Sequence, residues 1–588
     1  MILVVASALG LIGTPLPLPL PPLPEDPALL RAAPAETMLY AQWFGAGTPA
    51  ANPTNRSERL AAEPEVRAML VKLLGAMRGV YEMAAARATE ASHALTIYDL
   101  LTDALQRPGC AFVVDLQPLA GGVAVRFGDD AGPVAAKFAQ ALAALAPKIA
   151  AKKTVTVDGI EFAGLTVGEE GPFFGSAAVD GYFAFAIGEK VARQLVAGLR
   201  NQDQGLAGNG TLQQLRDGAK VERPVLRTWA APDKLAAKAP AANRFWGPLG
   251  LSRATAALAE SGLEGDGFVS RVQLAIPKPS GLLGELRGAT LSQDDLVLIP
   301  KDATMALAMR GGEGSFENLL LGVMGALTGQ EPGGDWQQFL TQLQSRTGVQ
   351  LRDDLLANAG DCVVAWSAPS QGGVGFTGAV AAVPLRDGEK FGEHLSAMWE
   401  KMVGIAPNKA TDREAKRAIS HRAYLEQFGH GGSKVWWVDL IDRDLPFAFS
   451  WTATANHFLF GLLPQPVRSA IDDSREPNFD QALARTPLIA RRGAANAMLY
   501  LDLRGLLQQG YGAGLMTLEI ASYEWQREGF DFDLADVPRL GALLPHLGPE
   551  LTVLETTPGG CRLVRRGSLP VFDALLISCA AACLMAVD

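Results

Sequence analysis

Two kinds of apolar pattern alternate along the first half of the chain. Short runs rich in branched and aromatic residues predict strands, and apolar residues that recur every three or four positions predict helices. Helices are expected at residues 63–86, from Pro133 onward and at 190–199. Strands are expected at residues 37–44, 110–116, 122–127, 154–157, 162–167, 182–187, 225–230 and 267–276.

The same succession of patterns begins again after Pro300. The second set of predicted helices lies at residues 316–327 and 336–343, from Lys390 onward and at 467–471. The second set of predicted strands lies at residues 303–309, 362–366, 379–385, 436–440, 447–451, 457–462, 498–503 and 551–555, with a last strand from Gly560.

One stretch of sequence occurs twice. Residues 97–114 read IYDLLTDALQRPGCAFVV and residues 351–365 read LRDDLLANAGDCVVA, with Asp-Leu-Leu, Gly and Cys in the same order. Cys110 and Cys362 therefore hold matching places, each at the start of an apolar run. A cysteine in that position is most often a free, buried thiol.

Other residues follow the same offset. Phe138 and Phe391 match on the predicted helices, and the closing strands from Gly267 and Gly560 each run ten positions to a proline. Strands joined partly by tight turns and partly by helices, without βαβ regularity, favour an α+β fold with mainly antiparallel sheets. We therefore expect two related α+β repeats, each a mainly antiparallel sheet with packed helices.

These patterns divide the chain into four segments. Residues 1–33 form a signal-like apolar segment and a Pro-rich linker, and folded structure is expected to begin near Pro34. The first α+β repeat covers 34–295 and the second covers 296–570, because a chain of 588 residues is too long for one core. An apolar C-terminal helix is expected over 571–588. The sequence leaves the relative packing of the two repeats open.

The amino terminus has the outline of an export signal. Residues 2–13 are apolar and end in small residues, and a Pro-Leu alternation follows at 15–24. No Lys or Arg occurs before Arg31, so the positively charged region of a signal peptide is missing. Either the true start lies upstream or the signal is atypical. We expect an exported protein that is periplasmic, extracellular or envelope-associated.

The carboxyl terminus is apolar on every side. Residues 574–587 are interrupted only by Ser578, and Cys579 and Cys583 lie four positions apart. A spanning helix needs about twenty residues, so this run is too short to cross a bilayer unaided. Apolarity all round implies burial. The two alternatives are docking on the second repeat, which the length favours, and insertion into a membrane.

Several local motifs resemble those of a known family. They are the Pro-x-acid approach to a strand at 34–36 and 300–302, the Asp-Leu-Leu…Gly-x-Cys strand, and the closing strand that runs from Gly to Pro. Together they resemble a family of exported bacterial proteins classed only as a domain of unknown function, over most of residues 34–570. The resemblance implies duplicated α+β repeats and supplies no catalytic residue.

Charge and motifs exclude several classes of partner. The net charge is −10 without a basic block, which argues against nucleic acid as a partner. Gly373, Gly375 and Gly378 fit a dinucleotide-binding pattern, but the next residues predict a strand rather than the helix that would meet a pyrophosphate. The glycine-rich 311–315 lacks the lysine of a phosphate loop. No cofactor is expected.

No constellation of residues points to metal or catalytic chemistry. None of the six histidines forms an i, i+4 pair, no cysteine pair has zinc spacing, and no Gly-x-Ser-x-Gly elbow is present. No metal site is expected and the catalytic residues are unknown. If the protein is an enzyme, His421 and His430, nine positions apart across a predicted hairpin, are the first suspects.

The sequence favours a non-catalytic role in binding or in envelope structure, with an unidentified ligand or envelope protein as partner. Two alternatives remain open. The first is a hydrolase-like enzyme with a site in the cleft between the repeats, where duplication would place a ligand. The second is a lipid or lipoprotein carrier, which would need an apolar groove between helix and sheet. Membrane association through either apolar terminal segment also remains open.

Overall fold

The structure is a computed structural model of the chain. It describes residues 20–569 except 87–90, 146–149, 169–170, 239–242, 313–315, 329–332, 373–374, 403–417, 421–422, 441–447, 474–494, 528–529 and 558. The predicted apolar helix at 571–588 and residues 1–19 lie outside this part.

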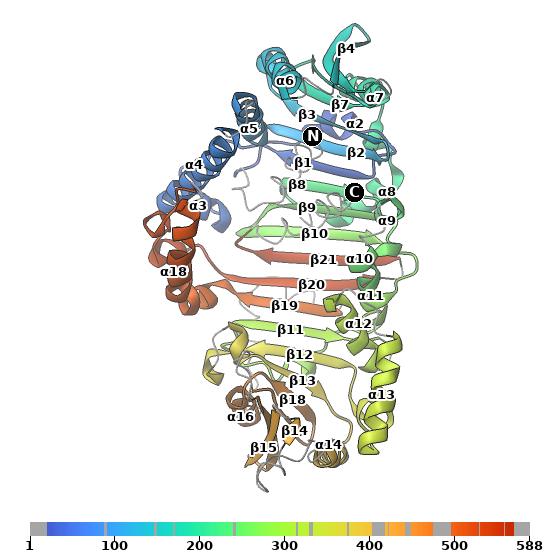
Figure 1. The fold of residues 1–588 in the computed structure, drawn as a ribbon, viewed down its shortest axis with the longest axis vertical. Coiled ribbons are helices and arrows are strands. Elements are labelled where there is room, and N and C mark those ends of the chain that lie inside the picture. The colour runs from blue at the N-terminus through green and yellow to red at the C-terminus, as the bar shows by residue number, and fades with distance from the viewer. Residues whose placement is uncertain are drawn as a thin grey trace.

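The described residues form one antiparallel sheet of 21 strands, which runs the length of the molecule (Figure 1). Its first ten strands, in spatial order, are β4 (Ala150–Val157), β5 (Ile160–Val167), β6 (Phe173–Val179), β7 (Tyr182–Ile187), β3 (Leu119–Arg126), β2 (Pro108–Leu116), β1 (Leu39–Phe44), β8 (Arg223–Ala230), β9 (Ala256–Glu264) and β10 (Gly267–Ala275).

The sheet continues because β10 pairs with a strand from the end of the chain. The remaining strands, in spatial order, are β21 (Gly560–Gly567), β20 (Pro549–Thr557), β19 (Ala497–Asp502), β11 (Met305–Arg310), β12 (Cys362–Ser367), β13 (Val380–Pro384), β18 (His457–Gly461), β17 (Ser450–Ala453), β16 (Ser433–Leu440), β15 (Ala423–His430) and β14 (Ala418–Ser420). The prediction of a mixed α and β fold with mainly antiparallel pairing is confirmed.

Helices connect the strands and cover the sheet. Their bounds are α2 (Pro27–Ala32), α3 (Arg56–Ala62), α4 (Pro64–Ala86), α5 (Ala91–Leu105), α6 (Ala131–Leu145), α7 (Glu189–Leu199), α8 (Gly210–Ala219), α9 (Pro232–Lys238), α10 (Asn243–Leu249), α11 (Gly281–Glu285), α12 (Phe316–Thr328), α13 (Gly333–Thr347), α14 (Gly388–Met402), α16 (Pro464–Asp473), α18 (Leu503–Arg527) and α19 (Leu540–Leu543). In Figure 1, α3, α4, α5 and α18 lie along one side of the strands, and α8 to α13 lie along the other.

The apolar residues form cores on both faces of the sheet. Residues directly opposite each other in an antiparallel ladder share a face, so the registers trace each face across the strands. On one face, α2 and α7 bury apolar residues against β2 and β3, α8 does so against β9 and β10, and α16 does so against β13 and β18. On the other face, α5 and α6 cover the first half of the sheet and α14 covers the second.

Local chemistry explains how these elements begin and turn. Asp26 accepts a hydrogen bond from the backbone N–H of Ala28 and Pro27 opens α2, which are typical signals of a helix start. The hairpin β4–β5 turns at Asp158-Gly159, where both residues have positive φ, as a two-residue turn of this type requires. Gly431-Gly432 makes the equivalent turn between β15 and β16.

The sequence placed the start of folded structure too late. Residues 27–32 form α2, and Leu29 is completely buried, so the expected boundary near Pro34 is wrong. The reason is that the apolar side of α2 packs on the first core of the sheet. The prediction also missed β6, β9 and the long helix α18.

Candidate functional site

Three of the described histidines pair separately with carboxylates. His430 of β15 lies 3.0 Å from Asp472 of α16, and His394 of α14 lies 3.7 Å from Asp354. His546 lies 3.4 Å from Glu63. His430 is therefore paired with Asp472, and His421, which the sequence suggested as its companion, falls outside the described residues. In the part of the chain that the structure describes, no three His, Cys, Asp or Glu side chains gather as metal ligands.

The described cysteines are chemically quiet. Cys110, Cys362 and Cys561 are free and buried, as predicted for the first two. Burial raises the pKa of the Cys110 thiol and that of the Cys561 thiol to about 12. Burial likewise raises the pKa of Cys362. Because the thiolate is the nucleophile, these residues stay protonated and unreactive near neutral pH.

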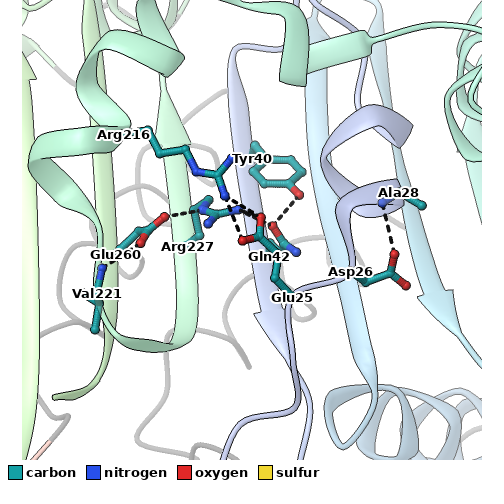
Figure 2. Close-up of polar contacts among 9 residues, drawn as sticks. All are labelled: Glu25, Asp26, Ala28, Tyr40, Gln42, Arg216, Val221, Arg227 and Glu260. Atoms are coloured by element: carbon teal, nitrogen blue, oxygen red, sulfur yellow. Dashed lines mark hydrogen bonds and ion pairs between the residues drawn. The ribbon is translucent and has the colours of Figure 1, made fainter.

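A buried arginine organises the polar centre of the first half (Figure 2). The side chain of Arg227, on β8, is only 2% exposed. Its Nε donates to Glu260 at 2.6 Å, and its Nη1 donates to Glu25 at 2.7 Å and to Gln42 at 3.2 Å. Tyr40 in turn donates its hydroxyl proton to Gln42 at 3.1 Å. Four separate segments of the chain therefore meet at one guanidinium.

Further bonds complete this network and fix its charges. Arg216 donates to both carboxylate oxygens of Glu25 at 2.8 Å, and the backbone N–H of Val221 donates to Glu260 at 3.1 Å. Burial alone would raise the pKa of Glu25, but the hydrogen bonds and charges of Arg227 and Arg216 outweigh it and lower that pKa. Burial acts to lower the pKa of Arg227, and its carboxylate partners reverse this and raise it. The network is a clasp of fixed charges rather than a site poised to exchange protons.

The clasp holds the residues that precede β1 against the sheet. Asp26, next to Glu25, caps α2 and accepts a hydrogen bond from the Tyr182 hydroxyl at 2.7 Å. Sequence reasoning did not identify this group. The available signal was Arg227 sharing a strand face with Trp229, because an arginine at a core position requires a buried acid.

An apolar cavity lies between α5, α6 and the sheet. Its volume is about 60 Å³. Nε1 of Trp43 donates to the backbone oxygen of Ala104 at 3.0 Å, so this N–H does not need a hydrogen-bond acceptor from a ligand. The lining residues are Trp43, Leu100, Leu101, Ala104, Leu105, Ala111, Val123, Val125, Phe127, Val134, Phe138 and Phe183.

The size and lining of this cavity define what it can hold. Engineered apolar cavities of about 150 Å³ stay dry and bind benzene. A cavity of less than half that volume suits a smaller apolar group, such as the end of an alkyl chain. Its described lining includes no charged side chain, so the arrangement supports binding and supplies no group for chemistry.

A second cavity of about 70 Å³ lies beside α3. Glu58 and Arg67 line it together with prolines and alanines. Glu58 is already bound by Arg223 through two hydrogen bonds of 2.9 Å, which leaves its carboxylate occupied. The apolar cavity under α5 and α6 is therefore the better candidate.

Within the described ranges, no helix is both long and apolar enough to cross a membrane. Comparison of the chain with family models, with curated proteins and with solved structures finds no match.

Proposed function

We propose that the protein is a non-catalytic binding protein that holds a small apolar ligand, or the end of an alkyl chain, in the cavity between α5, α6 and the sheet. The observation that carries the proposal is the cavity itself, a space of about 60 Å³ lined by apolar side chains. An empty space of this kind costs stability, because its lining side chains lack partners. A ligand that fills it regains those contacts.

The less buried side of the cavity is α5. Leu100, Leu101 and Leu105 are only half-buried, whereas the strand residues opposite, such as Val125, are fully buried. A small displacement of α5 away from the sheet would open the cavity without disturbing the ladder of β1 to β3. This arrangement corresponds to the carrier class, which needs an apolar space between helix and sheet.

Ligand binding can be tested by isothermal titration calorimetry with octanoate and with 1-octanol. Ala104→Phe places a phenyl ring in the cavity and should abolish binding. Ala136→Phe, on the exposed side of α6, is the matched control and should leave binding unchanged. Equal binding by both variants would remove the cavity as the site.

We also infer that the chain is a tandem duplication. Outward from the β10–β21 pair, ten strands on each side follow the same sequence order, and only β14 has no counterpart among the described strands. The ring centroids of Phe138 and Phe183 lie 5.3 Å apart, and those of Phe391 and Phe458 lie 5.4 Å apart in the corresponding place. Both pairs join the helix over the sheet to the same strand of their half.

The register between the halves supports the same inference. Arg271 lies directly opposite Val564. When Gly267 is aligned with Gly560, as the closing strands suggest, Arg271 and Val564 are also equivalent residues. A strand that pairs antiparallel with its own equivalent, at the same residue, lies on a twofold axis. The halves would then be related by a pseudo-twofold axis through this pair.

The proposed location is outside the cytoplasm, in the periplasm, the envelope or the medium. The apolar segment at residues 2–13 and the resemblance to an exported family support this proposal. Sequencing the amino terminus of the protein purified from its own cells is the test. A mature chain that begins between residues 13 and 25 agrees with export and processing, and an intact Met1 on cytoplasmic protein contradicts it.

A further inference from the structure

An apolar stripe on α18 faces solvent. Met516, Ile520 and Tyr523, at i, i+4 and i+7, lie on one side of the helix and are 72%, 77% and 66% exposed. The three side chains form a continuous ridge over about 10 Å of helix, at 1.5 Å per residue. A ridge of this kind on a protein surface indicates that something else packs there.

The helix α4, on the same side of the molecule, also exposes an apolar side chain. Both α4 and α18 contact the short turn at Leu534–Asp536, and Lys72 of α4 forms a 2.7 Å ion pair with Asp531. Val71, the residue before Lys72, is 71% exposed. The two helices lie on the same side of the molecule in Figure 1. We call Met516, Ile520, Tyr523 and Val71 the α4–α18 surface.

The described chain ends on the same side of the sheet as this surface. The hydroxyl of Ser57, on α3, donates to the backbone oxygen of Ser568 at 2.8 Å. From α3 the chain passes directly into α4, and Glu65 in the first turn of α4 pairs with Arg539. The last described residue therefore lies on the side of the sheet that carries α3, α4 and α18.

The sequence beyond residue 569 contains an apolar segment that has to be shielded from water. Residues 574–587 are apolar on every side, and as a helix they would be about 21 Å long, which is too short to cross a bilayer. The five residues from 569 to 574 can span up to about 17 Å when extended. This reach covers the distance from Ser57 along α3 to the first half of α4.

We propose that residues 574–587 pack as a helix on the α4–α18 surface and so cover its apolar side chains. The two surfaces match in character, because the segment is apolar on every side and the described residues leave most of the ridge open to solvent. They also match in length, because a helix of about 21 Å extends beyond both ends of the ridge. The partner of this surface is then the carboxyl-terminal segment of the same chain.

The segment carries its own reporters, Cys579 and Cys583. In the full-length protein, Ile520→Cys places a further thiol on the ridge. Oxidation with copper phenanthroline should join the introduced thiol to Cys579 or Cys583 within one chain, which peptide mapping and sedimentation would identify. Gln342→Cys, on the exposed side of α13, is the control and should form no such bond. Equal cross-linking of both variants, or of neither, overturns the proposal.

A second measurement needs no cross-link. Alkylation of Cys579 and Cys583 by iodoacetamide should be slow in the native protein. Ile520→Glu should accelerate it roughly tenfold, because a charge on the ridge removes the burial of one large apolar side chain. Gln508→Glu adds the same charge to the exposed part of the helix two turns before the ridge, and it should leave the rate unchanged. Protection that appears only when phospholipid vesicles are added would show insertion into a bilayer and overturn the docking.

Discussion

At the scale of single residues, the stability of the fold depends strongly on Arg227. Its guanidinium is buried and bonds three acceptors from different segments. Removing one partner of a buried ion pair leaves the other charge uncompensated. We expect Arg227→Ala to lower the free energy of unfolding by about 3–5 kcal/mol.

The matched control for this change is Arg216→Ala. Arg216 bonds the same Glu25, but its side chain is 36% exposed, so solvent screens the pair. Its loss should cost at most about 1 kcal/mol. Urea unfolding of both variants measures the two values. Similar losses of free energy of unfolding in the two variants would mean that the buried Arg227 contributes no more to stability than the more exposed Arg216.

Glu264 links stability to pH across the middle of the sheet. Arg271 donates to its two oxygens at 2.6 and 2.7 Å, and Arg566 donates at 2.9 Å from the other half of the chain. The hydrogen bonds from Arg271 and the charges of both arginines hold the pKa of Glu264 below its ordinary value.

The sign of the pH effect follows from this lowered pKa. A carboxyl of this kind contributes stability that is complete above the ordinary pKa of glutamate, and that is lost as the pH falls below it toward the lowered pKa. Unfolding by urea should therefore show a loss of stability as the pH falls from 6 to 3. In Glu264→Gln this loss of stability should be smaller. An identical acid dependence in the variant would show that Glu264 contributes none of it.

At the scale of elements, the sequence predicted what its apolar pattern encodes. Strands such as β2, β7 and β12 are apolar runs, and α6 and α14 carry Phe138 and Phe391 on their buried sides, as predicted. The strand β9 was missed because its alanines and Glu260 suggest no strand. Glu260 is buried there only because Arg227, 33 positions away, bonds it, and local patterns hold no trace of that pairing.

The helix α18 was also missed, and so were the contacts that form the clasp and the cavity. The helix α18 contains Gly505, Gly510, Gly512 and Gly514, which weaken helix propensity by about 1 kcal/mol each. The clasp around Arg227 and the apolar cavity both depend on contacts between distant segments. The mixed α and β content and the antiparallel pairing could be predicted because the local patterns carry them.

The helices over the sheet offer a test of their packing. Phe391 is 6% exposed and packs on Phe458, and Phe138 is 8% exposed and packs on Phe183 and Phe185. Phe391→Ala and Phe138→Ala should each destabilise the protein by about 3–5 kcal/mol, as for other large deletions in a core. Phe339→Ala on α13, where the side chain is half exposed, should cost far less. Thermal or urea melts that show no loss for Phe391→Ala would place that side of α14 in solvent.

At the scale of the whole molecule, the sheet is continuous only because β10 and β21 pair. Each of these strands would be the edge of its own half, with a row of unpaired backbone groups, if the other half were absent. Edge strands of this kind readily pair with another chain. Their pairing within one chain removes the hazard and joins the two halves along eight residue pairs, from Phe268–Gly567 to Ala275–Gly560.

The proposed duplication therefore makes a prediction about the first half alone. A fragment of residues 20–290 exposes β10, and a second copy can pair with it about the same twofold axis, because β21 is the proposed equivalent of β10. The register places Phe268 opposite Leu274 and Ser270 opposite Val272 of the second copy. It also places Arg271 opposite its own equivalent on the axis, where the bidentate bond from each Arg271 to Glu264 offsets the like charges. Sedimentation should show a concentration-dependent dimer with the strand content of the native half by circular dichroism.

Val272→Lys supplies the matched variant of this fragment. Val272 is buried opposite Leu563 in the whole chain, and in the fragment it would lie in the new seam. An inward-pointing charge on an edge strand blocks pairing, whereas at a free edge the long lysine side chain can reach water. The variant should therefore stay folded and monomeric. A folded wild-type fragment that remains monomeric at all concentrations would mean that β10 recognises β21 by features its own copy lacks, and that the two halves are not equivalent at their junction.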